Sequence, residues 1–163
     1  MSGLSSDVVL YLMSKGVRQS EIAREYGVSR QYVGQLAKQG GYDSPITKVS
    51  RNLPWEVDPA FYANTIYKGV TLHGHMMLAG KEKISATSQN KLLGFYRKLI
   101  RFNVVVDYDP DYLAQPGLTN TNGFAYVPRG AADKDYIIKV RPGVRITPLG
   151  EKLWRLPSDW ALD

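Results

Sequence analysis

The sequence has no cysteine among its 163 residues and only two histidines. Without cysteine, the chain has no disulfides and no Cys-ligated zinc or iron–sulfur site. It also has no apolar run near the ~20 residues of a membrane-spanning helix, and its first residues show no signal-peptide pattern. We therefore expect a soluble protein that has no membrane partner and stays in the cytoplasm.

Motifs for catalysis and for cofactors are also missing. The two histidines lie two residues apart in a predicted helix, so their side chains point about 200° away from each other and cannot share a metal. Asp107, Asp109 and Asp111 begin like a calcium loop, but its sixth position is Tyr112 rather than glycine, and we expect a polar loop instead. No glycine-rich phosphate loop and no Ser–His–Asp grouping occurs. These absences predict a protein that is not an enzyme and that uses no cofactor and no metal.

Positive charge is what the sequence has in excess, since 21 Lys and Arg face 15 Asp and Glu for a net charge of +6. The net charge is +2 over residues 1–50, +5 over 51–105 and −1 over 106–163. The first two-thirds of the chain thus carries the positive potential, which suits a polyanion such as DNA. A charged face exposed only to solvent is the alternative.

The order of predicted elements indicates a mainly α chain with a small β part, an α+β fold. Helical patterns occupy three short stretches and then two longer ones: about 6–15, 19–26, 30–38, 58–79 and 88–102. Strand-like runs follow at 104–106, 124–127 and 136–140. Glycines and a proline at 40–45 mark a break. We expect an N-terminal three-helix, homeodomain-like helix-turn-helix domain, a linker, and a helical C-terminal domain with a small antiparallel sheet: 1–40, 41–53 and 54–163.

Residues 19–38 match a helix-turn-helix at each structural position. Ala23 is the small side chain that two steeply crossing helices need, and Gly27 suits the tight turn because it tolerates positive φ. Ser29 is placed to cap the second helix of the pair. The positions that such a pair buries are all apolar: Ile22, Val28, Val33 and Leu36.

The predicted helix over 30–38 carries polar and small residues opposite its apolar face. Arginine pairs with guanine and glutamine with adenine, so the Arg and Gln side chains are candidate base readers and the lysine a candidate phosphate contact. The glycine would let the helix sit deep in a major groove without a Cβ clash. The alternative is a three-helix packing unit with a plain polar face. The candidate set is Ser29, Arg30, Gln31, Tyr32, Gly34, Gln35 and Lys38.

The predicted helix over 88–102 repeats this pattern, with a glycine at the centre of a basic face. Glycine costs an exposed helix interior about 0.5–1 kcal/mol relative to alanine, and close approach to a nucleic-acid backbone would justify that cost. A surface helix rich in lysine and arginine is the alternative. The candidates for a second DNA contact are Ser88, Asn90, Lys91, Gly94, Arg97, Lys98 and Arg101.

The linker has little hydrophobicity and carries Lys48, Arg51 and Asn52. An extended arm of this kind follows the DNA backbone or enters a minor groove, as homeodomain arms do. A flexible tether without DNA contacts is the alternative.

Several runs in the second part resemble the immunity repressors of temperate actinobacteriophages, and in particular the mycobacteriophage repressors that bind many asymmetric stoperator sites. The helix-turn-helix alone would not identify this family, because thousands of proteins share it. The runs that carry the resemblance are LPW at 53–55, LLGFY at 92–96, VVVDY at 104–108, GFAYVPR at 123–129, and Asp133. The similarity extends from about residue 6 to 145.

The resemblance implies a repressor that acts in the cytoplasm of a bacterial host cell and confers immunity. It implies binding of double-stranded DNA at short asymmetric operator and stoperator sites, which blocks early lytic transcription and obstructs transcribing RNA polymerase. A monomer that reads an asymmetric site needs two different DNA-contacting surfaces, which agrees with two basic helices. The family's DNA-reading role transfers to Arg30, Gln31, Gln35 and Lys38.

Two other functions remain alternatives. A small-terminase-like phage DNA-packaging protein also begins with a helix-turn-helix, but it needs a ring-forming helix, and the sequence shows no sustained heptad pattern. The DNA-targeting part of a recombinase or transposase is the other, although the spaced catalytic carboxylates of such enzymes are missing.

Overall fold

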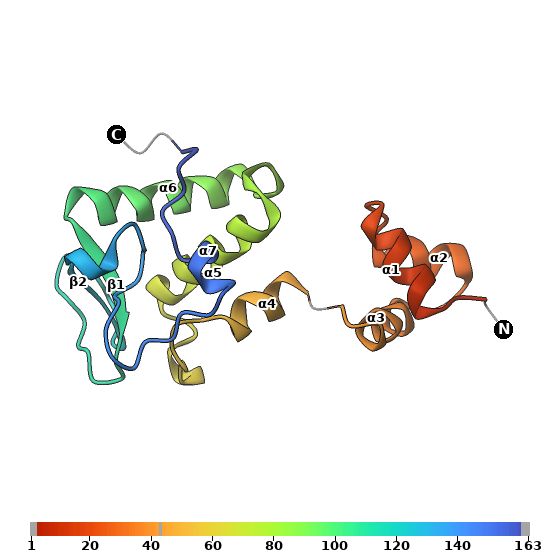
Figure 1. Cartoon of the computed structure of the whole chain (residues 1–163), viewed down its shortest axis with the longest axis horizontal. Helices are drawn as coiled ribbons and strands as arrows, with labels where there is room; N and C mark the ends of the chain where they lie inside the picture. The colour runs from red at the N-terminus through yellow and green to blue at the C-terminus, as the bar shows by residue number, and fades with distance from the viewer. Residues whose placement is uncertain (1–2, 43, 161–163) are drawn as a thin grey trace. The chain divides into compact units, whose positions relative to one another are not determined.

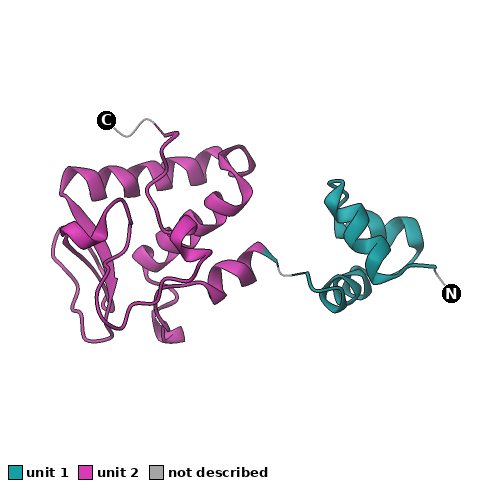
Figure 2. Ribbon diagram, in the orientation of Figure 1, with its two compact units in different colours: residues 1–44 teal, residues 45–163 magenta. Residues whose placement is uncertain are grey.

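The computed structural model describes residues 3–42 and 44–160. The chain forms two compact units, Met1–Ser44 and Pro45–Asp163, which Figure 2 shows in different colours. The described residues are mostly helical with a small two-stranded antiparallel sheet, and this confirms the expectation of a mainly α chain with a small β part.

Three helices build the first unit: α1 (Ser6–Ser14), α2 (Gln19–Tyr26) and α3 (Arg30–Gln39) (Figure 1). Each predicted boundary lies within about a residue of the observed one, and the Ser5 side chain caps α1. Gly27 ends α2 in the left-handed conformation, with φ at 66°, and this is the region that glycine adopts most easily. The core is formed by side chains from all three helices: Val9, Ile22, Ala23, Val33, Leu36 and Ala37.

Among its described residues, the second unit contains four helices, three short 3-10 turns and two strands. The helices are α4 (Pro45–Arg51), α5 (Thr65–Ala79), α6 (Ala86–Arg101) and α7 (Gly150–Leu153). The 3-10 turns are η1 (Pro59–Phe61), η2 (Lys81–Lys83) and η3 (Ala131–Asp133), and the strands are β1 (Val104–Tyr108) and β2 (Phe124–Pro128). The pattern predicted one helix from about residue 58 to 79, whereas Pro59–Phe61 form only a 3-10 turn and α5 begins at Thr65, where the Asn64 side chain caps it.

The sheet is smaller than the three strand-like runs suggested. β1 and β2 pair antiparallel, from Val104 opposite Pro128 to Tyr108 opposite Phe124. The third run forms no strand, because its hydrogen bonds are divided between two partners. The Val106 amide donates to the Ile137 carbonyl, whereas the Ile137 amide donates to the carbonyl of Trp154, which follows α7.

An ion pair that the sequence did not reveal holds the segment after the third run to the sheet. Asp107, expected in a polar loop, lies in β1 and is only 2% exposed. Its carboxylate accepts hydrogen bonds from the Arg141 guanidinium at 2.9 Å and from the Tyr112 hydroxyl at 2.8 Å. A buried carboxylate needs such partners, since its desolvation is otherwise costly.

The stretch expected as a linker differs from the structure. Residues 45–51 form helix α4, and Val49 of this helix is 2% exposed within the core of the second unit. The Arg145 guanidinium donates to the carbonyls of Arg51 and Leu53, which fixes the end of α4 to the chain before α7. Residues 45–53 are therefore part of the second unit and form neither an extended arm nor a flexible tether. Residue 43 of the expected linker, and residues 1–2 and 161–163 of the expected domains, lie outside the described residues.

Candidate nucleic-acid interface

Helix α3 presents its polar residues to solvent and its apolar residues to the core. Val33, Leu36 and Ala37 are buried, while the candidate base readers and the candidate phosphate contact are exposed: Arg30, Gln31, Gln35 and Lys38. Tyr32, another candidate on this helix, is 40% exposed. The helix contains no acidic residue, so its outer face is uniformly polar or positive.

The N-terminus of α3 is fixed by its cap. The Ser29 hydroxyl accepts a hydrogen bond from the amide of Tyr32 at 3.0 Å, as its position in the sequence predicted. This bond occupies one of the free amides of the first turn and sets where the helix starts. Arg30 and Gln31, which follow directly, are thereby held on a rigid element.

Gly34 has an intramolecular neighbour that the sequence did not suggest. A Cβ at this position would lie 3.5 Å from the side-chain oxygen of Gln19, the first residue of α2. That distance is an ordinary van der Waals contact, so the packing of the first unit does not require glycine here. Gln19 itself lies beside the outer face of α3, and only the tertiary arrangement of α2 and α3 brings it there.

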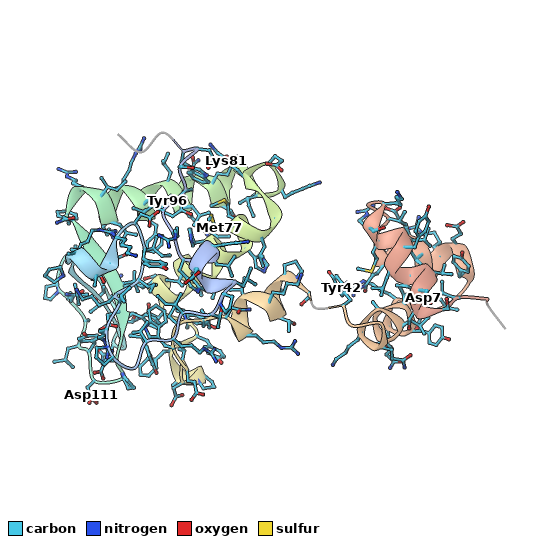
Figure 3. All side chains as sticks on the ribbon, in the orientation of Figure 1. Asp7, Tyr42, Met77, Lys81, Tyr96 and Asp111 are labelled. Carbon is cyan, nitrogen blue, oxygen red and sulfur yellow. The ribbon has the colours of Figure 1, made fainter. Side chains whose placement is uncertain are left out.

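Helix α6 also separates a buried face from a basic one. Leu92, Phe95, Tyr96 and Leu99 are buried, and Figure 3 labels Tyr96 on α6. Among the second-surface candidates, Ser88 and Lys98 are partly exposed. The other five are exposed: Asn90, Lys91, Gly94, Arg97 and Arg101. No acidic residue interrupts the helix, and Ser85 caps it by accepting a hydrogen bond from the amide of Ser88.

Gly94 lies in the middle of this basic face with open space around it. A Cβ built there would meet no atom within 4 Å outside its own stretch of helix. Packing inside the protein therefore does not require glycine at this position. The lower stability that glycine gives the interior of α6, relative to alanine, has no explanation within the protein itself.

A pocket lies beside Gly94, and its lining includes residues from α5 that the sequence reasoning missed. Lys68 and Gly69 of α5 face it together with Lys91 and Lys98 of α6. No pattern in the sequence pairs α5 with α6 in this register, so only the packing of the two helices reveals this arrangement.

The candidates on α4 and directly after it have separate roles in the structure. Lys48 and Arg51 are exposed. Asn52 is engaged within the second unit, where its amide donates to the Lys48 carbonyl at 2.8 Å and accepts from the Thr147 hydroxyl at 2.6 Å. The Trp154 indole also donates to the Asn52 carbonyl. Asn52 therefore joins α4 to α7, and its amide is not presented to a ligand.

His73 is fully buried inside the second unit rather than at a site. Its Nε2 lies 2.6 Å from the Leu153 carbonyl and therefore donates to it, which leaves Nδ1 to accept from the Tyr96 hydroxyl. Burial lowers the pKa of His73 to about 4, although the Leu153 carbonyl acts in the opposite direction. Within residues 3–42 and 44–160, no group of three His, Cys, Asp or Glu side chains is arranged to hold a metal. In the same part of the chain no helix is both long and apolar enough to cross a bilayer.

Comparison with known proteins places the chain in a family. A scan against models of known protein families matches none of them. The chain is, however, 33% identical over 150 residues to a repressor-like immunity protein of Mycobacterium phage L5, and the match covers 91% of this chain and 81% of that protein. The chain belongs to this family of phage immunity proteins.

The match to the L5 immunity protein involves both units. The second unit, Pro45–Asp163, is shorter than the 150 matched residues, so the similarity extends well into the three helices of the first unit. The resemblance seen in the short runs of the second part is thus confirmed over nearly the whole chain.

Proposed function

We propose that this member of the L5 immunity-protein family is a transcriptional repressor that binds double-stranded DNA. The observation that carries the proposal is the outer face of α3, which is polar, free of acidic residues and held on a capped, well-packed helix. Family membership supports the same function, because the phage L5 relative is named a repressor-like immunity protein.

In this proposal the first unit is a helix-turn-helix and α3 is its recognition helix. Arg30 pairs with a guanine, and Gln31 and Gln35 pair with adenines, because their side chains match the donors and acceptors of those bases in the major groove. Lys38 contacts a phosphate. Ser29 and Tyr32, at the start of the helix, lie where such helices meet the backbone, and Gly34 lets α3 approach the bases closely.

Helix α6 is the second DNA-contacting surface in the proposal. Its basic face supplies phosphate contacts through Lys91, Arg97, Lys98 and Arg101, with Ser88 and Asn90 as hydroxyl and amide donors. Gly94 leaves room for the DNA backbone at the centre of this face, which explains a glycine that packing inside the protein does not need. On α4, Lys48 and Arg51 remain candidates for phosphate contacts, whereas Asn52 is left out because its amide is engaged.

Two unlike surfaces on one chain fit an asymmetric site better than a palindrome. A dimer reads a palindrome with two copies of one surface, whereas a monomer with two different surfaces reads a site without symmetry. We therefore propose that the protein binds short asymmetric operator and stoperator sites as a monomer. Bound there, it blocks early lytic transcription and obstructs RNA polymerase.

Selection of bound sequences from a random DNA pool with the purified full chain tests this function. The expected result is a non-palindromic consensus, bound by one protein per site in a sedimentation measurement.

Replacing Arg30 or Gln31 by alanine should weaken the binding free energy for the selected site by about 1–3 kcal/mol and relax the preference at one base position. The matched control is Lys152→Ala, an exposed lysine of α7 outside both surfaces, which should bind as the unmodified protein does. A pool without enrichment refutes DNA recognition, and a palindromic consensus refutes the monomer.

A variant with Lys91, Arg97 and Lys98 all replaced by alanine tests the second surface. It should bind every sequence more weakly and leave the consensus unchanged, because phosphate contacts carry no sequence information. Unchanged affinity would show that α6 does not contact DNA, while leaving the role of α3 intact.

A further inference from the structure

The pocket between α5 and α6 combines three positive charges with an apolar floor. It has a volume of about 670 Å³. Leu72, Phe95 and Tyr126 contribute its apolar side, while Lys68, Lys91 and Lys98 contribute its charge. Pockets of this size that join an apolar wall to a few polar groups are typical sites for small organic ligands.

The charge of this pocket is not neutralised by the protein. No acidic residue is among those that line it. Among the described residues, Lys68 and Lys91 form no ion pair, and the Lys98 ammonium lies 5.2 Å from the centre of the Tyr126 ring, which is its one charge-related contact. Three like charges around one pocket repel one another, and a bound anion would remove this cost.

Two glycines on neighbouring helices create the space. Gly69 of α5 and Gly94 of α6 both line the pocket. A Cβ at Gly69 would meet only the Phe95 ring, at 3.8 Å, and a Cβ at Gly94 would meet nothing within 4 Å. A methyl group at either position would therefore fit without an internal clash, and a larger side chain would take up space in the pocket that both glycines line. Glycine lowers the stability of a helix interior relative to alanine, and an open pocket is a reason to retain both.

We propose that this pocket binds a small aromatic organic anion. The aromatic body lies against Phe95, Tyr126 and Leu72, where its apolar surface is removed from water. The anionic group, a carboxylate, sulfonate or phosphate, lies between the ammonium groups of Lys68, Lys91 and Lys98. The charge and the apolar floor are both needed, so a neutral aromatic molecule or a simple inorganic anion binds much more weakly.

The site also implies a means of regulation, and this part of the inference rests on the proposed function. Lys91, Gly94 and Lys98 belong to the proposed DNA-contacting face of α6 as well as to the pocket. An anion held by these lysines takes the place of DNA phosphates, so its binding weakens the grip of α6 on DNA. The anion is then an effector that releases the repressor from its site.

A fluorescence titration of the full chain, without DNA, tests the pocket itself. The probe is 8-anilinonaphthalene-1-sulfonate, and the comparison compound is N-phenyl-1-naphthylamine, which has the same ring systems without the sulfonate. The expected result is one saturable site for the sulfonate and at least tenfold weaker binding of the neutral compound.

Two variants outside the proposed DNA surface identify the place of binding. Lys68→Gln removes one charge and should weaken binding of the sulfonate about tenfold. Gly69→Leu should abolish it, because the new side chain enters the pocket. Lys152→Gln is the matched control and should bind the sulfonate as the unmodified protein does. Circular dichroism shows whether Gly69→Leu is folded, and Lys68→Gln, a change at an exposed side chain, decides the question if it is not. Equal binding by Lys68→Gln and the unmodified protein, or by the neutral compound and the sulfonate, overturns the proposal.

The same probe then tests regulation with the selected DNA site. At ten times its own Kd, the sulfonate should raise the Kd for DNA about tenfold if the two ligands exclude each other at α6, and it should have no effect on the Gly69→Leu protein. An unchanged Kd for DNA in the presence of bound sulfonate refutes the regulation and leaves the pocket. Absence of DNA binding without the sulfonate refutes the proposed function instead, and the titration without DNA still decides the pocket.

Discussion

Replacing Gly94 by alanine should move folding stability and DNA affinity in opposite directions. Gly94 lies inside α6, and a Cβ there has no neighbour within 4 Å. The methyl group therefore costs nothing in packing, and the change from glycine to alanine in a helix interior stabilises the second unit by about 0.5–1 kcal/mol. For a unit of this size, the thermal midpoint should rise by about 2–5 °C.

The same substitution should weaken DNA binding if the sugar–phosphate backbone of the DNA approaches α6 at Gly94. The methyl group then stands between the helix and the phosphates, and a loss of about 1–2 kcal/mol corresponds to a Kd raised about 5- to 30-fold. Thermal unfolding measures the change in the midpoint, and fluorescence anisotropy with the selected DNA site measures the change in the Kd. Thr87→Ala, at an exposed position in the first turn of α6, is a control that changes the helix without changing the basic face.

The result that refutes the reasoning is a Gly94→Ala protein with a raised midpoint and unchanged DNA affinity. It would show that the DNA backbone does not approach α6 at Gly94. A lowered midpoint would contradict the packing argument instead, since it would require a neighbour that the structure does not contain.

Gly34→Ala extends the test to α3. Its Cβ would make only an ordinary contact with Gln19, so we again expect higher stability and weaker DNA binding.

Three further predictions concern pH, a buried carboxylate and salt. The pKa of His73 is about 4 in the folded chain and about 6.5 in the unfolded chain. Because the unfolded chain is protonated first as the pH falls, the free energy of unfolding should decrease by about 2 kcal/mol between pH 7 and pH 5. Urea unfolding of the His73→Gln protein should not show this decrease. Asp133→Ala should destabilise the second unit by about 3 kcal/mol in the same assay, because the carboxylate accepts from the Gly130 and Val140 amides and pairs with Lys139 at 2.9 Å; a loss below 1 kcal/mol would contradict this. About six phosphate contacts should give a log–log salt slope of the DNA affinity near −5, and Lys98→Ala should reduce its magnitude by about 1; an unchanged slope would exclude Lys98 as a contact.

The helices and the two polar faces could be predicted because their signals are local. The periodicity of α3 and α6, the cap at Ser29 and the turn at Gly27 depend on residues a few positions apart. Helix α4 was missed because only seven residues form it and a single one, Val49, is buried. Its stability comes from packing against distant segments, and short helices of this kind leave little pattern in a sequence.

The remaining differences share a long-range cause. The run at 136–140 has the composition of a strand, but its backbone bonds to both β1 and the segment after α7. Asp107 has the sequence context of a polar loop, and its partner Arg141 lies 34 positions later. Lys68 belongs to a pocket that α5 and α6 line together, and its neighbours there come from the other helix. In each case the decisive partner is far away in the sequence, where composition and spacing carry no information.

The shortness of the connection between the units has a consequence for the DNA sites that such a repressor accepts. Tyr42 packs against the core of the first unit, and α4 begins at Pro45, so only two residues separate the two. Three residue steps span at most about 11 Å, about the length of three base pairs of DNA. In the proposed function, a connection this short makes binding of the second unit an intramolecular step once the first unit is bound, with a high effective concentration. An operator that lacks the contact of either unit should therefore be bound much more weakly than the complete site.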